Sequence, residues 1–199
     1  MRRMGLSYQR ELYVCIANNT REFIEDTRET EMKNTALIVI DLQNDITKNY
    51  KKIIGQVNEA IDWAVENEMH IIYIKHYNLS EKTRTFKPDT KGAELVPELK
   101  IVTDNVFEKS KASALTSEAF AEFITKNRIT EFYVIGADAT ACVKSTSYNL
   151  VKAGYKVHVI SDCVTSYDLK KLDEMFAYYG SKGCDVKKLG DYTDGRNTI

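Results

Sequence analysis

The chain of 199 residues is poor in the features that mark several protein classes. Its 4 cysteines form no CxxC pair and follow no regular spacing, so neither a zinc site nor a disulfide framework is indicated. Basic and acidic side chains number 28 and 29, which leaves no basic excess for nucleic acid. No apolar run approaches transmembrane length, and the basic start MRRMG leads into no apolar stretch of signal type. We therefore expect a cytoplasmic protein that binds neither nucleic acid nor membranes.

Proline is also scarce, and both prolines fall in one stretch. Pro88 and Pro97 lie between residues 78 and 106, where neither a helical nor a strand pattern is visible. Structureless segments of this length in compact domains are mostly functional or disordered. We expect this long loop to carry residues that select a ligand.

Apolar runs of strand length alternate with amphipathic stretches along the rest of the chain. Continuous apolar runs are typical of strands buried on both faces, and alternation with helices favours a parallel sheet. The pattern predicts a three-layer, doubly wound (Rossmann-like), mostly parallel sheet of six strands in one domain spanning 33–199, preceded by an N-terminal helical extension at 1–32. The expected strands are 36–40, 70–77, 105–109, 131–136, 156–162 and 184–189. The expected helices are 53–67, one starting at 116 or 117, one carrying Cys142 and ending near 153–154, and 169–183.

Cys142 is the most informative residue. It follows an apolar run, Gly136 and a series of small residues, at the point where a strand gives way to a helix. Free backbone N–H groups and the positive end of the helix dipole favour the thiolate, and the same amides could hold an oxyanion. The other cysteines, Cys15, Cys163 and Cys184, fit the ordinary role of buried packing residues.

Two further polar residues are expected at the same edge of the sheet. Asp41 directly follows the first apolar run and could serve as a general base, although a carboxylate capping a turn explains its position equally well. Lys109 closes the short run VFEK and could stabilise both anions, although a solvated surface lysine is the simpler interpretation for a residue in this lysine-rich region.

Taken together, these residues resemble the isochorismatase-like cysteine hydrolases, a superfamily that includes nicotinamidases and N-carbamoylsarcosine amidohydrolases. The resemblance covers about residues 34–190 and is carried by the collinear segments TALIVIDLQND, KGAELVPEL, VFEKSKASAL, VIGADATACVKST and GYKVHVISDCVTS. It implies that Asp41 is the general base, Lys109 its electrostatic partner and Cys142 the nucleophile. It also implies a cis peptide bond at Ala137–Asp138, with the amides of Asp138 and Cys142 forming the oxyanion hole, and self-association into a homodimer or homotetramer.

The chain also departs from the pattern of those relatives. Nicotinamidases of the superfamily carry an Asp-x-His metal motif after the second strand, whereas here His76 and Asn78 stand at the two positions. We therefore expect no metal and no other cofactor. Asp138 and Ala139 replace a more usual Ala-Thr pair, and Leu115 stands where phenylalanine is common.

The resulting hypothesis is a metal-independent cysteine hydrolase that cleaves a C–N bond of a small amide or ureide through a thioester. We expect four side chains to line its pocket: Gln43, His76, Phe86 and Tyr167. For each of them, ordinary packing or exposure to solvent is the simpler alternative. Leu42-Gln43 breaks the Asp-x-Asp of a haloacid dehalogenase phosphatase, and the absence of glycine from DLQND excludes a nucleotide-binding loop. A binding or assembly protein that keeps the fold without catalysis remains the alternative.

Overall fold

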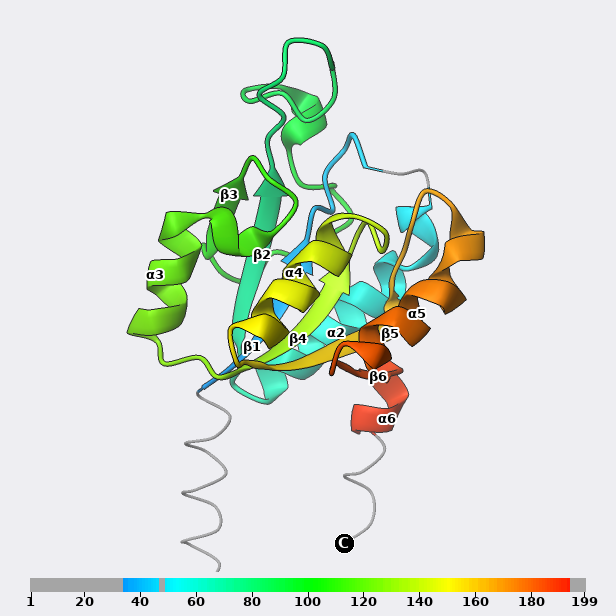
Figure 1. The fold of residues 1–199 in the computed structure, drawn as a ribbon. Helices are drawn as coiled ribbons and strands as arrows, with labels where there is room; N and C mark the ends of the chain where they lie inside the picture. Colours follow the sequence, from blue (N-terminus) through cyan, green and yellow to red (C-terminus); the bar gives the residue numbers. More distant parts are fainter. Residues whose placement is uncertain (1–33, 47–48, 194–199) are drawn as a thin grey trace, which may run out of the picture.

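The computed structural model describes residues 34–46 and 49–193. The expected N-terminal helical extension at 1–32 lies outside these residues. Within the described part, the chain folds around one sheet whose six strands run in the order β3-β2-β1-β4-β5-β6, every neighbouring pair being parallel (Figure 1). The strands are β1 (Thr35–Ile40), β2 (His70–His76), β3 (Val106–Lys109), β4 (Glu131–Gly136), β5 (Lys156–Val164) and β6 (Asp185–Lys187).

The sheet is buried on both faces because its central strands are apolar at every position. All residues of β1 are buried. Side chains of successive residues point to opposite faces of a strand, so Ile38 and Ile40 join one apolar cluster while Leu37 and Val39 join the other. The continuous apolar run that predicted a central parallel strand is explained by these two cores.

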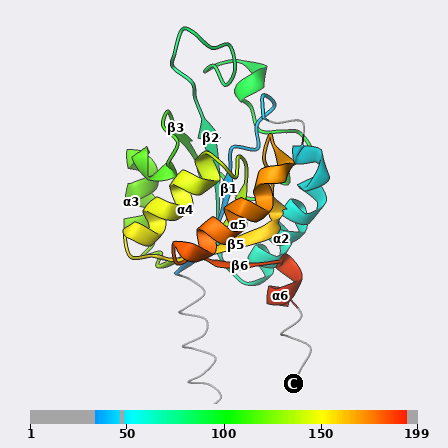
Figure 2. The ribbon, with the colours of Figure 1, turned by 45° about the vertical axis from the view of Figure 1, so that its right-hand side comes forward.

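Helices cover both faces (Figures 1 and 2). On one face lie α3 (Glu118–Lys126), α4 (Cys142–Lys152) and α5 (Leu172–Ser181), which contribute apolar side chains such as Phe120, Val143 and Tyr179 to the first cluster. On the other face lie α2 (Ile54–Glu66) and α6 (Leu189–Thr193), represented in the second cluster by Ile61 and Leu189. The predicted three-layer, doubly wound α/β architecture is confirmed.

The predicted elements differ from the observed ones mainly at their ends. In residues 34–46 and 49–193, four 3₁₀ turns join the helices and strands: η1 (Tyr50–Lys52), η2 (Lys91–Ala93), η3 (Ala114–Thr116) and η4 (Leu169–Lys171). The helix expected from residue 169 is divided between η4 and α5, and the helix expected to carry Cys142 begins at that residue. The five-residue α6 was not predicted, because so short a segment shows no helical periodicity.

The strand order determines where a site can form. The chain adds β2 and β3 on one side of β1, then crosses to add β4, β5 and β6 on the other. The order therefore reverses between β1 and β4, and ligands of open α/β sheets bind outside the carboxyl ends of the strands at such a switch point. Asp41 follows β1 there, and the Cys142 loop follows β4.

Among the described residues, no helix is both long and apolar enough to cross a lipid bilayer.

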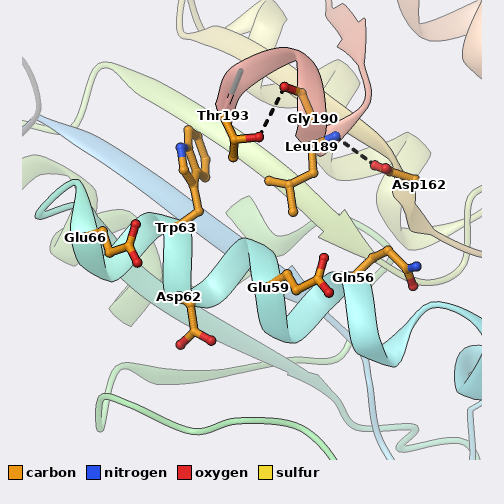
Figure 3. A pocket seen from close by; sticks show the side chains of 9 residues that line it. All are labelled: Gln56, Glu59, Asp62, Trp63, Glu66, Asp162, Leu189, Gly190 and Thr193. Carbon is orange, nitrogen blue, oxygen red and sulfur yellow. Dashed lines mark hydrogen bonds between the residues drawn. The ribbon is translucent and has the colours of Figure 1, made fainter. Parts of the chain in front are cut away.

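The surface also has a hollow away from the switch point. A hollow of about 320 Å³ opens between α2 and α6 and is lined partly by acidic side chains, including Glu59, Asp62 and Asp162 (Figure 3). It shares no residue with the switch-point site, so it is a separate feature of the surface.

Candidate active site

Asp41 is held in place by the end of β1. Its backbone N–H donates to the carbonyl of Ile74 at 3.0 Å, and its φ of 53° turns the chain out of the strand. Only 2% of the residue is exposed. One carboxylate oxygen, Oδ1, has no hydrogen-bond partner among the described residues. A buried carboxylate with a free oxygen is suited to accept a proton.

Lys109 reaches Asp41 across the end of an intervening strand. It is the last residue of β3 and pairs in register with His76, the last residue of β2, while β1 lies beyond β2. Its ammonium Nζ lies 2.7 Å from Asp41 Oδ2, with the lysine side chain fully withdrawn from solvent. The alternative of a solvated surface lysine is therefore wrong.

Cys142 approaches the same ammonium from the other side of the switch point. It is the first residue of α4, and Lys109 Nζ donates to its Sγ at 3.3 Å. The turn that delivers it needs Gly136, whose φ is 113° and where a Cβ would lie 2.2 Å from the carbonyl oxygen of Ile40. Asp41, Lys109 and Cys142, far apart in the sequence, are thus brought together around one ammonium group.

The peptide bond between Ala137 and Asp138 is cis, as the resemblance implied. In this loop Ala139 N–H donates to Thr165 at 3.0 Å and Val143 N–H donates to Asp138 at 3.1 Å. The N–H groups of Asp138 and Cys142, by contrast, donate to no other group within residues 34–46 and 49–193. Two unused amides in the loop that leads to Cys142 have the chemistry of an oxyanion hole.

Burial dominates the electrostatics of the site. Burial, followed by the negative charge of Asp41, raises the pKa of the Cys142 thiol to about 12, and Lys109 only partly opposes them. Desolvation of the sulfur thus opposes the effect of the helix N-terminus and of Lys109, both of which favour the thiolate. Burial also raises the pKa of Asp41, against the opposing effect of Lys109. A thiol with a raised pKa needs a base to remove its proton before it can attack.

His76 is a third neighbour of the lysine ammonium. Its Nδ1 lies 3.4 Å from Lys109 Nζ. Burial, and then the positive charge of Lys109, lower the pKa of the imidazole, so His76 is neutral near pH 7 and its Nδ1 can accept from the ammonium. An ammonium has three hydrogens, and Asp41, Cys142 and His76 together supply three acceptors for them.

The other residues expected to line the pocket lie in different environments. Gln43 is fully buried, and both hydrogens of its amide are taken by the carbonyls of His76 and Ala93, at 3.0 and 2.8 Å. Phe86, at a φ of 56°, packs edge-on against His76 with ring centroids 5.7 Å apart. Tyr167 is 75% exposed. Direct contact of each with a substrate stays a prediction.

A lysine ammonium stands among the groups of the site that could bind a divalent metal. A carboxylate oxygen of Asp41, a ring nitrogen of His76 and Cys142 Sγ lie within 4.8 Å of one another, a set of donors that could otherwise hold such an ion. Lys109 Nζ, however, stands 2.7 to 3.4 Å from an atom of each of the three. Asn78, the second position of the metal motif, uses its side-chain oxygen to accept from Ser80 N–H at 3.0 Å. A cation is already built into the cluster.

Comparison with known proteins agrees with this fold. The family model of the isochorismatase domain matches residues 35–186, and the chain therefore belongs to the isochorismatase family, a family of hydrolases. Among curated relatives, Nicotinamidase 3 of Arabidopsis thaliana is 24% identical over 165 residues, covering 76% of this chain and 83% of the relative. A second A. thaliana protein, described as a probable inactive nicotinamidase, is 27% identical over 160 residues, covering 67% of this chain and 82% of that protein.

Solved structures show the same fold at low identity. The pyrazinamidase of Pyrococcus horikoshii, crystallised with zinc, superposes with a TM-score of 0.72 at 22% identity, covering 78% of this chain and 99% of the other. The N-carbamoylsarcosine amidase of Thermoplasma acidophilum gives a TM-score of 0.68 at 21% identity, covering 78% and 96%. The predicted family resemblance is confirmed.

Proposed function

We propose that the protein is a metal-independent cysteine hydrolase that cleaves the C–N bond of a small amide or ureide. The observation that carries the proposal is the position of the Lys109 ammonium, 2.7 Å from Asp41 Oδ2 and 3.3 Å from Cys142 Sγ. One buried cation can thus stabilise a carboxylate and a thiolate in turn, while the proton moves between them.

The first half of the reaction forms a thioester. Asp41 takes the proton of the Cys142 thiol, and the sulfur attacks the carbonyl carbon of the substrate. The negative charge that develops on the carbonyl oxygen is held by the N–H groups of Asp138 and Cys142. The C–N bond then breaks, and the leaving amine receives the proton from Asp41.

The second half returns the enzyme to its starting state. Asp41 takes a proton from water, and the hydroxide adds to the thioester carbonyl. The C–S bond breaks, the acid product is released, and the sulfur recovers its proton from Asp41. Throughout both halves Lys109 keeps its charge beside whichever of the two groups is anionic.

Release of ammonia or amine from a panel of small amides tests the proposal. The panel comprises nicotinamide, carbamoyl amino acids and biuret-like ureides, with chelator present and with Cys142→Ala as the matched variant. We expect turnover of at least one substrate by the wild type, none by the variant, and no effect of the chelator. Turnover that the chelator abolishes, or that Cys142→Ala retains, would contradict the proposal.

A binding role without catalysis is the second candidate. It is favoured by the match to the A. thaliana protein described as a probable inactive nicotinamidase. Absence of turnover across the panel, with tight binding of one member measured by calorimetry, would support this role. Self-association into a homodimer or homotetramer stays a prediction in either case, and light scattering of the purified chain would measure it.

A further inference from the structure

The side chain of Asp138 joins two loops at the switch point. Its Oδ1 accepts from the backbone N–H and the hydroxyl of Thr140, both at 2.7 Å, within the loop that leads to Cys142. Both carboxylate oxygens lie 3.0 Å from the hydroxyl of Ser166, and Oδ2 accepts from Tyr167 N–H at 2.7 Å, in the loop that follows β5. Four donors from two loops therefore converge on one carboxylate.

Backbone contacts continue this connection. Thr165 N–H donates to the carbonyl of Gly136 at 3.0 Å, and Ala139 N–H donates to the carbonyl of Thr165 at 3.0 Å. The amide of Asn49 in turn donates to the carbonyls of Ser166 and Tyr167, at 2.8 and 3.1 Å, and so fixes the second loop from behind. Asp138 therefore has two parts with different surroundings. Its carboxylate belongs to this network, and its backbone N–H belongs to the proposed oxyanion hole.

The geometry points to Asp138 as a positioning residue, whose carboxylate fixes the direction of its own N–H group, and of the Cys142 loop, toward the developing oxyanion. This inference rests on the proposed function. It assigns to the side chain a task separate from that of the backbone amide: the carboxylate does not touch the substrate but orients the group that does.

The chemistry of the contacts explains why the residue is an aspartate. All four partners are N–H or O–H donors, and a carboxylate can accept on both oxygens, whereas an asparagine would turn an NH₂ group against one set of donors. Oxyanion stabilisation depends on donors placed in advance with good geometry, so a small rotation of the Asp138 amide would weaken it. The effect should appear in reactions that form an oxyanion and be absent from reactions that do not.

Two reactions of the Cys142 sulfur differ in whether an oxyanion forms, and their rates can be compared. With p-nitrophenyl acetate, the Cys142 sulfur attacks the ester carbonyl, its proton passes to Asp41, and the C–O bond breaks to release p-nitrophenolate through an oxyanion. With iodoacetamide, the sulfur displaces iodide from the methylene carbon and no oxyanion forms. Both rates are measured on the full chain at one pH, with adducts located by peptide mass mapping and the Cys142→Ala background subtracted.

For Asp138→Ala we expect acylation by the ester to fall about 10- to 100-fold, while alkylation by iodoacetamide stays within about 2-fold of the wild type. Asp138→Asn should show a smaller fall in acylation alone. Asp168→Asn is the matched control, because Asp168 is exposed and its side chain accepts from Lys170 N–H at 3.1 Å in the same post-β5 loop. Both of its rates should equal those of the wild type.

The outcomes distinguish this inference from the proposed function. Wild-type acylation at Cys142 that Asp138→Ala leaves unchanged would overturn the inference alone. Equal falls in acylation and alkylation would also overturn it, because they would show a general structural role. No acylation of Cys142 in the wild type, despite alkylation there, would overturn the proposed function and this inference with it.

Discussion

Lys109 Nζ lies 2.7 Å from Asp41 Oδ2 in a pair whose side chains are 0% and 3% exposed. Charges buried this deeply lose their hydration, so each depends on the other for compensation. Lys109→Met, which removes the charge and leaves an apolar side chain one atom shorter, should lower the free energy of unfolding by about 3–5 kcal/mol at pH 8. Asp41→Asn combined with Lys109→Met should recover much of that loss, since no buried charge is left unpaired.

The same pair predicts a pH dependence for Lys109→Met. Burial already raises the pKa of Asp41 in the wild type, and loss of the lysine charge should raise it further. A carboxyl whose pKa is higher in the folded than in the unfolded state destabilises the fold above its folded pKa, and this cost disappears as the pH falls below the unfolded value. Urea unfolding should therefore show a smaller loss at pH 5 than at pH 8. A loss independent of pH would contradict this account of the pair.

Asp41→Asn should have opposite effects on two properties of Cys142. The negative charge of Asp41 is one cause of the raised pKa of the thiol, while Lys109 lowers it. Neutralising Asp41 should therefore lower the thiol pKa from about 12 and speed alkylation by iodoacetamide at pH 8, by about 10-fold or more. Turnover of amides should nevertheless be lost, because no group carries the proton to the leaving amine. Slower alkylation in Asp41→Asn would contradict the claim that the charge of Asp41 raises the thiol pKa, because it would show that proton transfer to Asp41 matters more than its charge.

Glu131, at the start of β4, should stabilise the fold in a pH-dependent way. Its Oε1 lies 2.6 Å from His158 Nε2 and 2.9 Å from Lys156 Nζ. The hydrogen bond with His158 is the largest cause that lowers the pKa of this carboxyl, from 4.5 to about 2. Because the folded-state pKa is the lower one, the stabilisation is complete above about pH 4.5 and is lost as the pH falls toward 2.

Glu131→Gln tests this prediction. It should cost about 1–2 kcal/mol at pH 7, a value reduced for the partial exposure of the side chain, and clearly less at pH 3. Asp62→Asn is a suitable control, since Asp62 pairs with Lys100 at a site where their side chains are 52% and 42% exposed. It should change stability little at either pH. Equal losses at pH 7 and pH 3 for Glu131→Gln would refute the ionic origin of the effect.

Gly136 and Gly154 allow backbone strain to be separated from steric conflict. Both have positive φ, 113° at Gly136 and 92° at Gly154. A Cβ added at Gly136 would lie 2.2 Å from the carbonyl oxygen of Ile40, whereas a Cβ added at Gly154 would meet nothing within 4 Å. Gly154→Ala should cost about 1 kcal/mol, and Gly136→Ala about 2 kcal/mol or more beyond that. Denaturant unfolding of the two variants measures the difference. Equal costs would mean that the Cys142 turn adjusts freely.

The sequence was most informative where a residue's role follows from its local pattern. Continuous apolar runs predicted β1 and β4, and the small residues before Cys142 predicted the change from a strand to a helix. The contact between His76 and Lys109 depends on β2 and β3 being neighbours, which no local pattern states. The raised pKa of the Cys142 thiol does not follow from the local pattern either, because burial of the sulfur depends on the fold. The side-chain contacts of Asp138 join loops 28 residues apart, so they too required the fold.

In the proposed mechanism Cys142 carries the acyl group of the substrate during turnover. Acid quenching during steady-state hydrolysis of an active amide, followed by peptide mass mapping, tests it most directly. We predict an adduct of acyl mass on the peptide that contains Cys142, removable by hydroxylamine and absent from Cys142→Ala. Hydrolysis that continues in Cys142→Ala, or an acyl adduct that maps to another residue during turnover, would contradict the account.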